Sequence, residues 1–190
     1  MTQPTLLPIC GVILAGGEGR RMGGQDKGWV DYQGQPLIQH VIQRLQPQLP
    51  DLLINANRNL TDYQTLGYPV VSDIEQGFHG PLMGILTGLK ASSQEWTLFV
   101  PCDGPFLPEK LAERLYQAAI TNACDIAVAS DGEWLQPVVV LIRSQLATQL
   151  EQAMLSGERK PDRWYASRGM TQVVFDADSL RNFNKPDEMV

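Results

Sequence analysis

Residues 9–17 have the sequence ICGVILAGG, in which an apolar run ends in alanine and two glycines. A short apolar run that stops at a loop signal is typical of a strand buried on both faces of a sheet. The glycines that follow let the backbone approach a ligand closely, because they carry no Cβ atom. This stretch therefore predicts a first strand at residues 9–14 that leads directly into a glycine-rich loop.

Short apolar runs and longer amphipathic runs alternate along the rest of the chain. We expect further strands at residues 52–56, 69–72, 97–100, 126–129, 137–142 and 172–175, and a minor strand at residues 29–32. We expect helices at residues 36–45, 82–92, 108–121 and 144–155, and a short one after residue 161. Gly84 and Gly88 give the second of these helices a small-residue face for close packing.

This alternation predicts an α/β fold with a mostly parallel sheet and helices on both faces. The sequence contains no internal repeat and no linker rich in Ser, Gly or Pro. We therefore expect a single domain over residues 1–190.

The composition narrows the possible functions. The chain has 190 residues, with 15 Lys and Arg against 21 Asp and Glu, so its net charge is −6. An acidic protein is a poor candidate for nucleic-acid binding, which depends on a basic surface. No apolar run approaches the roughly 20 residues of a membrane span, and the N-terminus does not resemble a secretory signal. The three cysteines form no close pair, so we expect a cytoplasmic protein in a reducing compartment.

The loop after the first strand has the features of a polyphosphate site. Residues 16–24 contain five glycines, and Arg20, Arg21 and Lys27 add positive charge nearby. Backbone N–H groups of such a loop can converge on an anion. The positions of its glycines and lysine fit neither the dinucleotide-binding fingerprint nor the P-loop. We therefore predict phosphate binding by a loop of another kind.

Polar residues also stand at the ends of three other predicted strands. Asn55 ends the second strand, Asp73 follows the third, and Asp103 follows the strand at 97–100. Ligands of parallel sheets bind at the carboxyl ends of strands, so these side chains are candidates for one site. Asp103 suits Mg²⁺, which takes one or two carboxylates together with phosphate oxygens and water. Turn or capping chemistry is the alternative for each of them.

Other chemically interesting residues are weaker candidates. We expect His40 to be structural, and Trp96 and Trp134 to be packing residues. Cys102 has no candidate base nearby, which argues against a nucleophile. Residues 158–168 hold four basic and two acidic residues, so this segment is either a solvated helix face or a surface for a second anionic substrate.

Several of these segments together resemble the molybdenum cofactor guanylyltransferase family. The matching residues are Leu14-Ala15-Gly16-Gly17, Arg21-Met22-Gly23, Asp26-Lys27, Gly80-Pro81-Leu82, Pro101-Cys102-Asp103 and Asn182-Phe183-Asn184-Lys185-Pro186-Asp187-Glu188. The N-terminal signature alone is typical of nucleotidyltransferases in general. Its combination with the C-terminal asparagines is more specific, and the match covers essentially the whole chain.

The resemblance implies a Rossmann-like nucleotidyltransferase fold that depends on Mg²⁺. It implies transfer of GMP from GTP to the terminal phosphate of molybdopterin or Mo-molybdopterin, which yields the guanine dinucleotide cofactor and pyrophosphate. The N-terminal part would hold GTP and Mg²⁺, and the C-terminal part would hold molybdopterin. The family also implies transient contacts with molybdenum-insertion proteins or target molybdoenzymes, and a monomer fits this picture.

The resemblance also assigns residues. The nucleotide-binding set is Leu14, Ala15, Gly16, Gly17, Arg20, Lys27, Asn55, Asp73 and Asp103, with Mg²⁺ on Asp103. The candidate set for molybdopterin is Asn182, Asn184, Arg159 and Lys160. Gly28 and Gly104 depart from the larger residues frequent at these positions, and we expect them to loosen their loops without removing a ligand.

The chemistry of the implied reaction fits the residues. The attacking phosphate is already ionised at neutral pH, so no general base is needed. Nucleotidyl transfer is catalysed mainly by positioning and by neutralising charge. We therefore assign Lys27, Arg21 and Asp103 to catalysis, with Arg20 and Arg21 on the β- and γ-phosphates and Lys27 on the α-phosphate. Asp73 or the backbone of residues 14–16 would recognise guanine.

Three other interpretations remain open at this point. A cytidylyltransferase of the same cofactor is the nearest, and a sugar-phosphate nucleotidyltransferase is the second, although 190 residues is short for a sugar pocket. The third is a nucleotide-sensing module without turnover. Pyrophosphate release with GTP against CTP, measured with molybdopterin as acceptor, is the most useful test among them.

Overall fold

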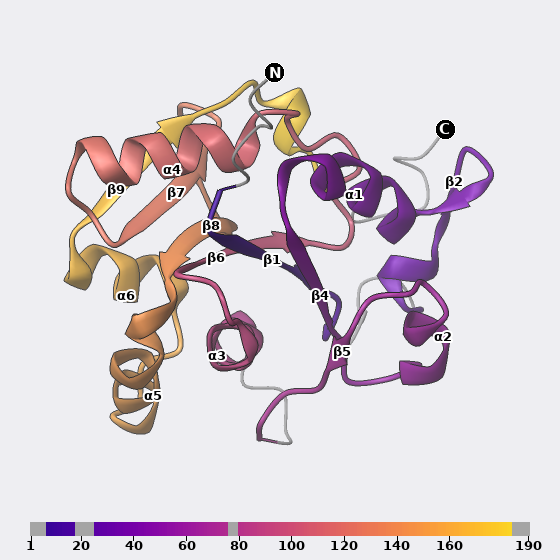
Figure 1. The fold of residues 1–190 in the computed structure, drawn as a ribbon, viewed down its shortest axis with the longest axis horizontal. Coiled ribbons are helices and arrows are strands. Elements are labelled where there is room, and N and C mark those ends of the chain that lie inside the picture. Colours follow the sequence, from indigo (N-terminus) through magenta and orange to yellow (C-terminus); the bar gives the residue numbers. More distant parts are fainter. Residues whose placement is uncertain (1–6, 18–24, 76–79, 184–190) are drawn as a thin grey trace.

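A computed structural model describes residues 7–17, 25–75 and 80–183 (Figure 1). Its main sheet has the strand order β5-β4-β1-β6-β8-β7-β9, and a small second sheet pairs β2 with β3. The strands are β1 (Ile9–Leu14), β2 (Asp31–Tyr32), β3 (Gln35–Pro36), β4 (Asp51–Asn55), β5 (Val70–Val71), β6 (Trp96–Pro101), β7 (Ile126–Ser130), β8 (Leu135–Arg143) and β9 (Met170–Val174).

The main sheet is mostly parallel, as predicted. Strand β1 pairs in parallel with β4 and β6, and the pairs β4–β5 and β7–β9 are also parallel. Strand β8 is the exception, because it runs antiparallel to both β6 and β7. The connection from Ser130 to Leu135 is a tight turn, too short for the crossover that a parallel neighbour requires.

Helices cover both faces of the sheet, which also confirms the prediction (Figure 1). The α-helices are α1 (Leu37–Leu45), α2 (Leu60–Gln64), α3 (Pro81–Ala91), α4 (Leu111–Thr121), α5 (Ala147–Leu155) and α6 (Pro161–Arg168). The 3-10 turns are η2 (Lys27–Trp29), η3 (Gln46–Gln48), η4 (Ser144–Leu146) and η5 (Asp178–Leu180). Helices α1 and α4 pack on one face, and α3, α5 and α6 on the other.

Alternation along the strands builds a hydrophobic core on each face. In β1, Ile9 and Ile13 join the core under α1 and α4, whereas Val12 joins the core under α3. This is the two-residue period of a strand buried on both faces. Helix α3 lies very close to the sheet at Gly88, where a Cβ atom would be 2.5 Å from Phe99 Cε1. The small-residue face predicted for this helix is therefore used for packing.

Several predicted boundaries are wrong for identifiable reasons. Helix α4 begins at Leu111, because residues 108–110 form a turn in which Leu111 N donates to Pro108 O. Ser144 starts a 3-10 turn rather than the α-helix. The predicted minor strand at residues 29–32 is reduced to Asp31–Tyr32, since residues 27–29 form η2. Helix α2 was not predicted.

The two tryptophans expected to be packing residues have opposite environments. Trp96 is fully buried in β6, as predicted, but Trp134 is 72% exposed. The prediction for Trp134 is wrong because it lies in the β7–β8 turn, where Asp131 Oδ1 accepts from its backbone N–H at 2.7 Å. Two such bonds, from Trp134 and Glu133, lower the pKa of Asp131 below its usual value.

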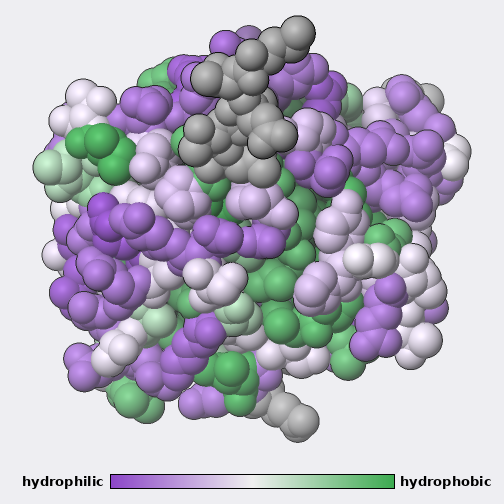
Figure 2. Space-filling model, viewed as in Figure 1, coloured by the Kyte–Doolittle hydropathy of each residue, from purple (hydrophilic) through white to green (hydrophobic). Residues whose placement is uncertain are grey.

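The surface is largely polar in the view of Figure 2. Hydrophilic residues cover most of this face, and hydrophobic residues show near the middle, where β1 and β4 lie in Figure 1. None of the helices in the described part of the chain has the length and apolar character needed to cross a membrane.

Candidate active site

The carboxyl ends of β1 and β6 lie side by side, and the connections of the sheet diverge at this point. The chain leaves β1 through α1 toward β4, and it leaves β6 through α4 toward β7 on the other side. Ligands of open α/β sheets bind at such a topological switch point. Cys102 N donates to Leu14 O at 3.2 Å, so the two strands stay joined where the loops begin. The predicted site residues Leu14, Ala15 and Asp103 lie at this edge.

Lys27 and Asp103 meet in this region. Lys27 Nζ lies 2.8 Å from Asp103 Oδ2, and the two side chains are 25% and 8% exposed. A carboxylate so nearly buried needs a close positive partner or hydrogen-bond donors, because burial removes its hydration. The structure thus brings together two residues that the sequence assigned to catalysis.

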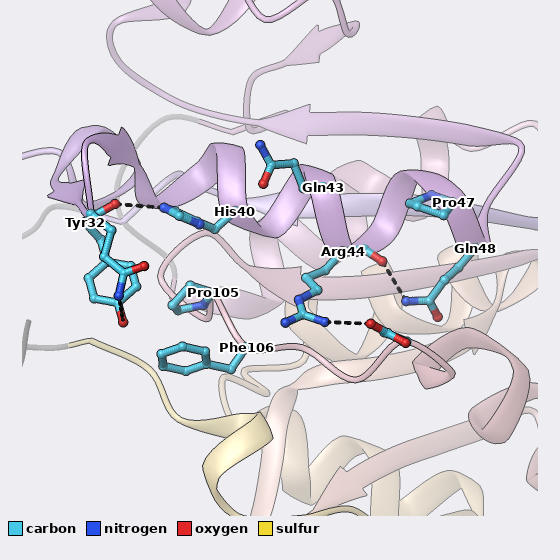
Figure 3. Close-up of a pocket in the computed structure, with 10 residues that line it drawn as sticks. Tyr32, His40, Gln43, Arg44, Pro47, Gln48, Pro105 and Phe106 are labelled. Atoms are coloured by element: carbon cyan, nitrogen blue, oxygen red, sulfur yellow. Dashed lines mark hydrogen bonds and ion pairs between the residues drawn. The ribbon is translucent and has the colours of Figure 1, made fainter.

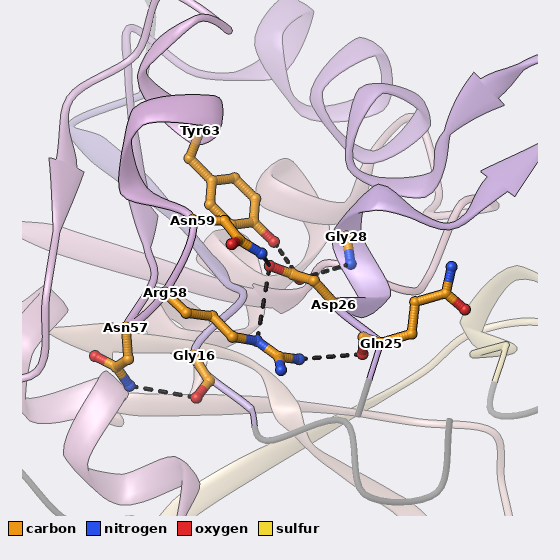
Figure 4. Close-up of polar contacts among 8 residues, drawn as sticks. All are labelled: Gly16, Gln25, Asp26, Gly28, Asn57, Arg58, Asn59 and Tyr63. Atoms are coloured by element: carbon orange, nitrogen blue, oxygen red, sulfur yellow. Dashed lines mark hydrogen bonds and ion pairs between the residues drawn. The ribbon is translucent and has the colours of Figure 1, made fainter. Parts of the chain in front are cut away.

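The turn that carries Lys27 is anchored to α2 through Asp26 (Figure 4). Asp26 Oδ1 accepts from Gly28 N at 3.3 Å and from the Tyr63 hydroxyl at 2.6 Å, and Asp26 Oδ2 accepts from Asn59 Nδ2 at 2.9 Å. Burial, together with nearby acidic groups and the bond to Asp26, raises the pKa of Tyr63 far above its usual value. The Tyr63 hydroxyl group therefore stays protonated and donates a hydrogen bond that holds the Asp26 carboxylate in place.

Sequence reasoning missed the role of this anchor. Asp26 is the N-cap of η2, and Asp is a preferred N-cap residue, so a local signal existed for that part. No pattern in the sequence predicts the contacts of Tyr63 and Asn59 with Asp26, since both residues are far from Asp26 in the chain. Arg58 adds to the anchor, because its Nη2 donates to Gln25 O at 3.0 Å.

Asp73 lies in a second polar cluster at the same edge of the sheet. Asn55 Nδ2 donates to Asp73 Oδ1 at 2.9 Å, and Asn57 Nδ2 donates to Asp73 Oδ2 at 2.8 Å. Asn57 Nδ2 also reaches Gly16 O at 3.3 Å. Three predicted residues, Gly16, Asn55 and Asp73, are therefore brought together, and Asn57 is a member that sequence reasoning missed. Its position two residues after the end of β4 was the available signal.

The C-terminal part of the described chain also reaches the site. Phe183 N donates to Asp103 O at 2.9 Å, and the Phe183 ring packs on Tyr32 with centroids 4.9 Å apart. A Cβ atom on Gly104 would lie 3.0 Å from Asn182 Oδ1, so Asn182 borders the loop that holds Asp103. The predicted Asn184 lies outside the described residues.

The expectation that Gly28 and Gly104 loosen their loops is not supported. A Cβ atom on Gly28 would lie 2.5 Å from the Tyr63 hydroxyl oxygen, and Gly104 is packed against Asn182 as described above. Each glycine lets a neighbouring side chain approach closely, so both positions are packed.

Arg159 and Lys160 lie in the connection between α5 and α6. Arg159 Nη1 donates to Met154 O at 2.6 Å and to Glu158 O at 2.7 Å, so it bonds backbone carbonyls at the end of α5. The N–H groups of Lys160 and Arg159 bind the Glu158 carboxylate and lower its pKa. The aromatic residues of this segment, Trp164 and Tyr165, are buried in the core. They are therefore not part of an exposed binding surface.

Of four further predicted residues, the structure describes two, Cys102 and His40. Arg20 and Arg21 lie outside the described residues. Burial, with the nearby carboxylates of Asp103 and Asp26, raises the pKa of Cys102 well above its usual value, which agrees with the argument against a nucleophile. His40 Nε2 lies 2.8 Å from Tyr32 O, which fits the expected structural role.

Asp103 is the residue that the sequence predicts to be a metal ligand. Within residues 7–17, 25–75 and 80–183 there is no group of three or more His, Cys, Asp or Glu that could hold a metal ion. A protein site for zinc needs several such ligands. Mg²⁺ takes only one or two carboxylates and completes its ligands with phosphate oxygens and water, so the prediction for Asp103 does not require such a group.

A polar groove of about 700 Å³ lies beside the segment that follows Asp103 (Figure 3). It runs between α1 and residues 105–109, and some of the polar side chains that line it form hydrogen bonds across it. Arg44 Nη1 donates to Glu109 Oε1 at 3.1 Å, and Gln48 Nε2 donates to Arg44 O at 2.7 Å and to Pro108 O at 3.0 Å. These bonds fasten α1 to the segment before α4, which is a structural role.

Known proteins resemble this chain over nearly all of its length. The molybdenum cofactor guanylyltransferase of Shewanella sediminis is 45% identical over 184 residues, which cover 96% of this chain and 94% of that protein. The protein of the same name from Shewanella putrefaciens is 46% identical over the same shares of both chains.

Solved structures show the same fold. The molybdopterin-guanine dinucleotide biosynthesis protein A of Archaeoglobus fulgidus superposes with a TM-score of 0.77 at 24% identity, covering 95% of this chain and 94% of that one. This confirms the predicted nucleotidyltransferase fold. The family model described as the MobA-like NTP transferase domain matches residues 11–173. Together with the two relatives, this match confirms the predicted family: the chain belongs to the MobA-like NTP transferases.

Proposed function

We propose that this protein transfers GMP from GTP to the terminal phosphate of molybdopterin or Mo-molybdopterin. The observation that carries the proposal is the 2.8 Å contact of Lys27 with Asp103 at the carboxyl edge of the sheet. Two relatives of 45% and 46% identity that are named molybdenum cofactor guanylyltransferase support the choice of substrates.

The bonds exchanged in this reaction explain which groups the site needs. An oxygen of the molybdopterin phosphate attacks the α-phosphorus of GTP and forms a new P–O–P linkage. The bond from the α-phosphorus to the bridging oxygen of the β-phosphate breaks, and pyrophosphate leaves. The nucleophile is ionised before it arrives, so the site needs positive charge and positioning rather than a base.

Lys27 supplies charge at the reacting phosphate. Its ammonium group sits on η2, which Asp26 and Tyr63 anchor to α2, so its position is set before substrate binds. A preorganised cation stabilises the negative charge that develops in the transition state without a cost of reorganisation. In the proposal, Gly16, Gly17, Arg20 and Arg21 hold the β- and γ-phosphates, and Lys27 acts on the α-phosphate.

Asp103 is the residue that would hold Mg²⁺. When bound, Mg²⁺ supplies further positive charge to the phosphate oxygens of GTP. Asp103 Oδ2 already accepts from Lys27, so the carboxylate and the lysine act on the same part of the nucleotide. Asp103 would therefore hold the Lys27 ammonium group and Mg²⁺ in fixed positions relative to each other.

The acceptor would lie on the other side of Asp103. Asn182 borders the Asp103 loop, and we propose that it binds molybdopterin together with Asn184. Arg159 and Lys160 are included as more distant candidates. In this proposal the enzyme works in the cytoplasm as a monomer, and transient contacts with molybdenum-insertion proteins or target molybdoenzymes deliver its product.

A pyrophosphate-release assay tests the proposal. Purified protein, Mg²⁺ and molybdopterin are combined with either GTP or CTP, and the dinucleotide product is identified by mass spectrometry. We expect release with GTP and the guanine dinucleotide as product. A preference for CTP would make the protein a cytidylyltransferase. Nucleotide binding without turnover on any phosphate acceptor would favour a sensing module.

A further inference from the structure

We propose that Asn57 is a positioning residue that determines which nucleobase the site accepts. The proposal rests on the function proposed above and on the sequence-based expectation that Asp73 or the backbone of residues 14–16 recognises guanine. Asn57 contacts both Gly16 and Asp73. The inference therefore holds whichever of the two contributes more to the recognition of guanine.

Asn57 joins three loops that follow three different strands. It lies just after β4, and its Nδ2 donates to Gly16 O after β1 at 3.3 Å and to Asp73 Oδ2 after β5 at 2.8 Å. Its Oδ1 accepts from Asp73 N at 2.9 Å. One side chain therefore fixes both the backbone and the carboxylate of Asp73 against the loop that follows the first strand.

The amide of Asn57 has a defined orientation. Its Oδ1 must face the Asp73 N–H, because an N–H cannot donate to an amide nitrogen. Its Nδ2 must then face the Asp73 carboxylate and the Gly16 carbonyl, both of which are acceptors. An acid at this position would place a second carboxylate against Asp73, which is unfavourable.

The Asp73 carboxylate is held so that both of its oxygens stay available to a base. Asn55 Nδ2 occupies one lone pair of Oδ1, and Asn57 Nδ2 occupies one of Oδ2. Each carboxylate oxygen accepts about two hydrogen bonds, so one acceptor position on each remains. Two parallel acceptors match the N1–H and N2–H donors of guanine, whereas adenine and cytosine each present a ring nitrogen acceptor there.

Asn57 allows a cleaner test than Asn55. Asn55 is 2% exposed, also donates to Val71 O at 3.3 Å, and packs against α3 at Gly84. Changing it disturbs the core. Asn57 is exposed at the rim, so its replacement changes the geometry of Asp73 and Gly16 without opening a cavity. Asn57 also packs closely against Gly16, because a Cβ atom on Gly16 would lie 2.7 Å from Asn57 Nδ2.

The test compares GTP with ITP, whose base lacks the 2-amino group and keeps N1–H. Binding of each nucleotide is measured by titration calorimetry without acceptor, and kcat/KM is measured by pyrophosphate release with molybdopterin. We expect Asn57→Ala to lower the preference for GTP over ITP about tenfold, the effect of losing one well-oriented hydrogen bond to a charged group. Asn57→Asp has nearly the same shape and should lose more, because it repels Asp73.

A matched control is Asn122→Ala, which removes an exposed asparagine that bonds Ala118 O at 2.9 Å and Thr171 Oγ1 at 3.2 Å. It lies after α4, at the opposite edge of the sheet, and should keep the wild-type preference. The inference is overturned if Asn57→Ala and Asn57→Asp both bind GTP and ITP with the wild-type ratio. Failure of the proposed function is distinguishable, since wild-type protein would then release no pyrophosphate from GTP with molybdopterin.

Discussion

Lys27 Nζ contacts Asp103 Oδ2 at 2.8 Å and so joins the turn η2 to the segment that follows β6. Before substrate arrives, each charge is the other's partner, so neither is left alone in a poorly hydrated place. In the proposed function, the triphosphate would bind beside this pair, with Lys27 and a magnesium ion both held by Asp103. Under that proposal, the free protein already holds Lys27 where the triphosphate would bind.

The first prediction concerns Lys27. Lys27→Ala should lower kcat/KM for GMP transfer about 10²- to 10³-fold, the loss typical of one preorganised donor to a developing negative charge. Pyrophosphate release measures the effect. Lys90→Ala is a matched control, since Lys90 pairs with Glu151 on α5. Near-normal turnover of Lys27→Ala with unchanged GTP binding would contradict the assignment.

The second prediction concerns the anchor of η2. Tyr63→Phe removes only the hydroxyl that donates to Asp26 at 2.6 Å and should lower the free energy of unfolding by about 1.5–3 kcal/mol. It should also reduce kcat, because Lys27 loses its fixed support. Urea unfolding and turnover are measured on the same preparations. Tyr116→Phe is the control, as its ring packs against Trp96; equal effects of the two changes would argue against the anchor.

A third prediction compares two tryptophans. Trp96→Ala should cost about 3–5 kcal/mol of folding stability, because a fully buried indole is replaced by a cavity. Trp134→Ala should change stability by less than about 0.5 kcal/mol, since its side chain is 72% exposed. Chemical denaturation of both variants checks the difference. A large loss for Trp134→Ala would mean that the β7–β8 turn packs differently.

The fourth prediction uses the cysteines and pH. Only the thiolate reacts with iodoacetamide, and burial raises the pKa of Cys10 to about 11 and that of Cys102 well above its usual value. Below its raised pKa each of these thiols stays protonated, so both should remain unmodified in native protein between pH 7 and pH 9. Cys124 is partly exposed and should be labelled first. Intact-mass spectrometry should show one adduct in native protein and three in urea; early labelling of Cys102 would contradict the buried environment.

Most of the fold was predictable because its signals are local. The apolar runs of β1 and β6 and the spacing of apolar residues in α1 follow directly from burial on one or two faces. Helix α2 was missed because it has five residues and a single buried side chain, Tyr63. Trp96 and Trp134 show a related difficulty. Their burial is decided by which strands become neighbours in the sheet, and residue type does not reveal this.

The site was predictable to the extent that strand ends meet at one edge. That rule placed Asn55, Asp73 and Asp103 at one edge, because parallel strands share a direction. In the structure Asn55 contacts Asp73, whereas Asp103 contacts Lys27. It could not give Asn57 and Tyr63 their roles. Their partners, Asp73 and Asp26, are far from them in the chain, and only the folded chain brings such groups within hydrogen-bonding distance.

The antiparallel course of β8 affects how this protein can change during evolution. Strands β7 and β8 are joined at the carboxyl edge by a short turn, whereas the connection from β6 to β7 at that edge passes through α4. A short exposed turn tolerates insertions better than a segment that must deliver a helix to the core. New residues added near Trp134 would extend over the rim while Lys27 and Asp103 keep their positions. The fold can therefore acquire a new recognition surface without altering its phosphate chemistry.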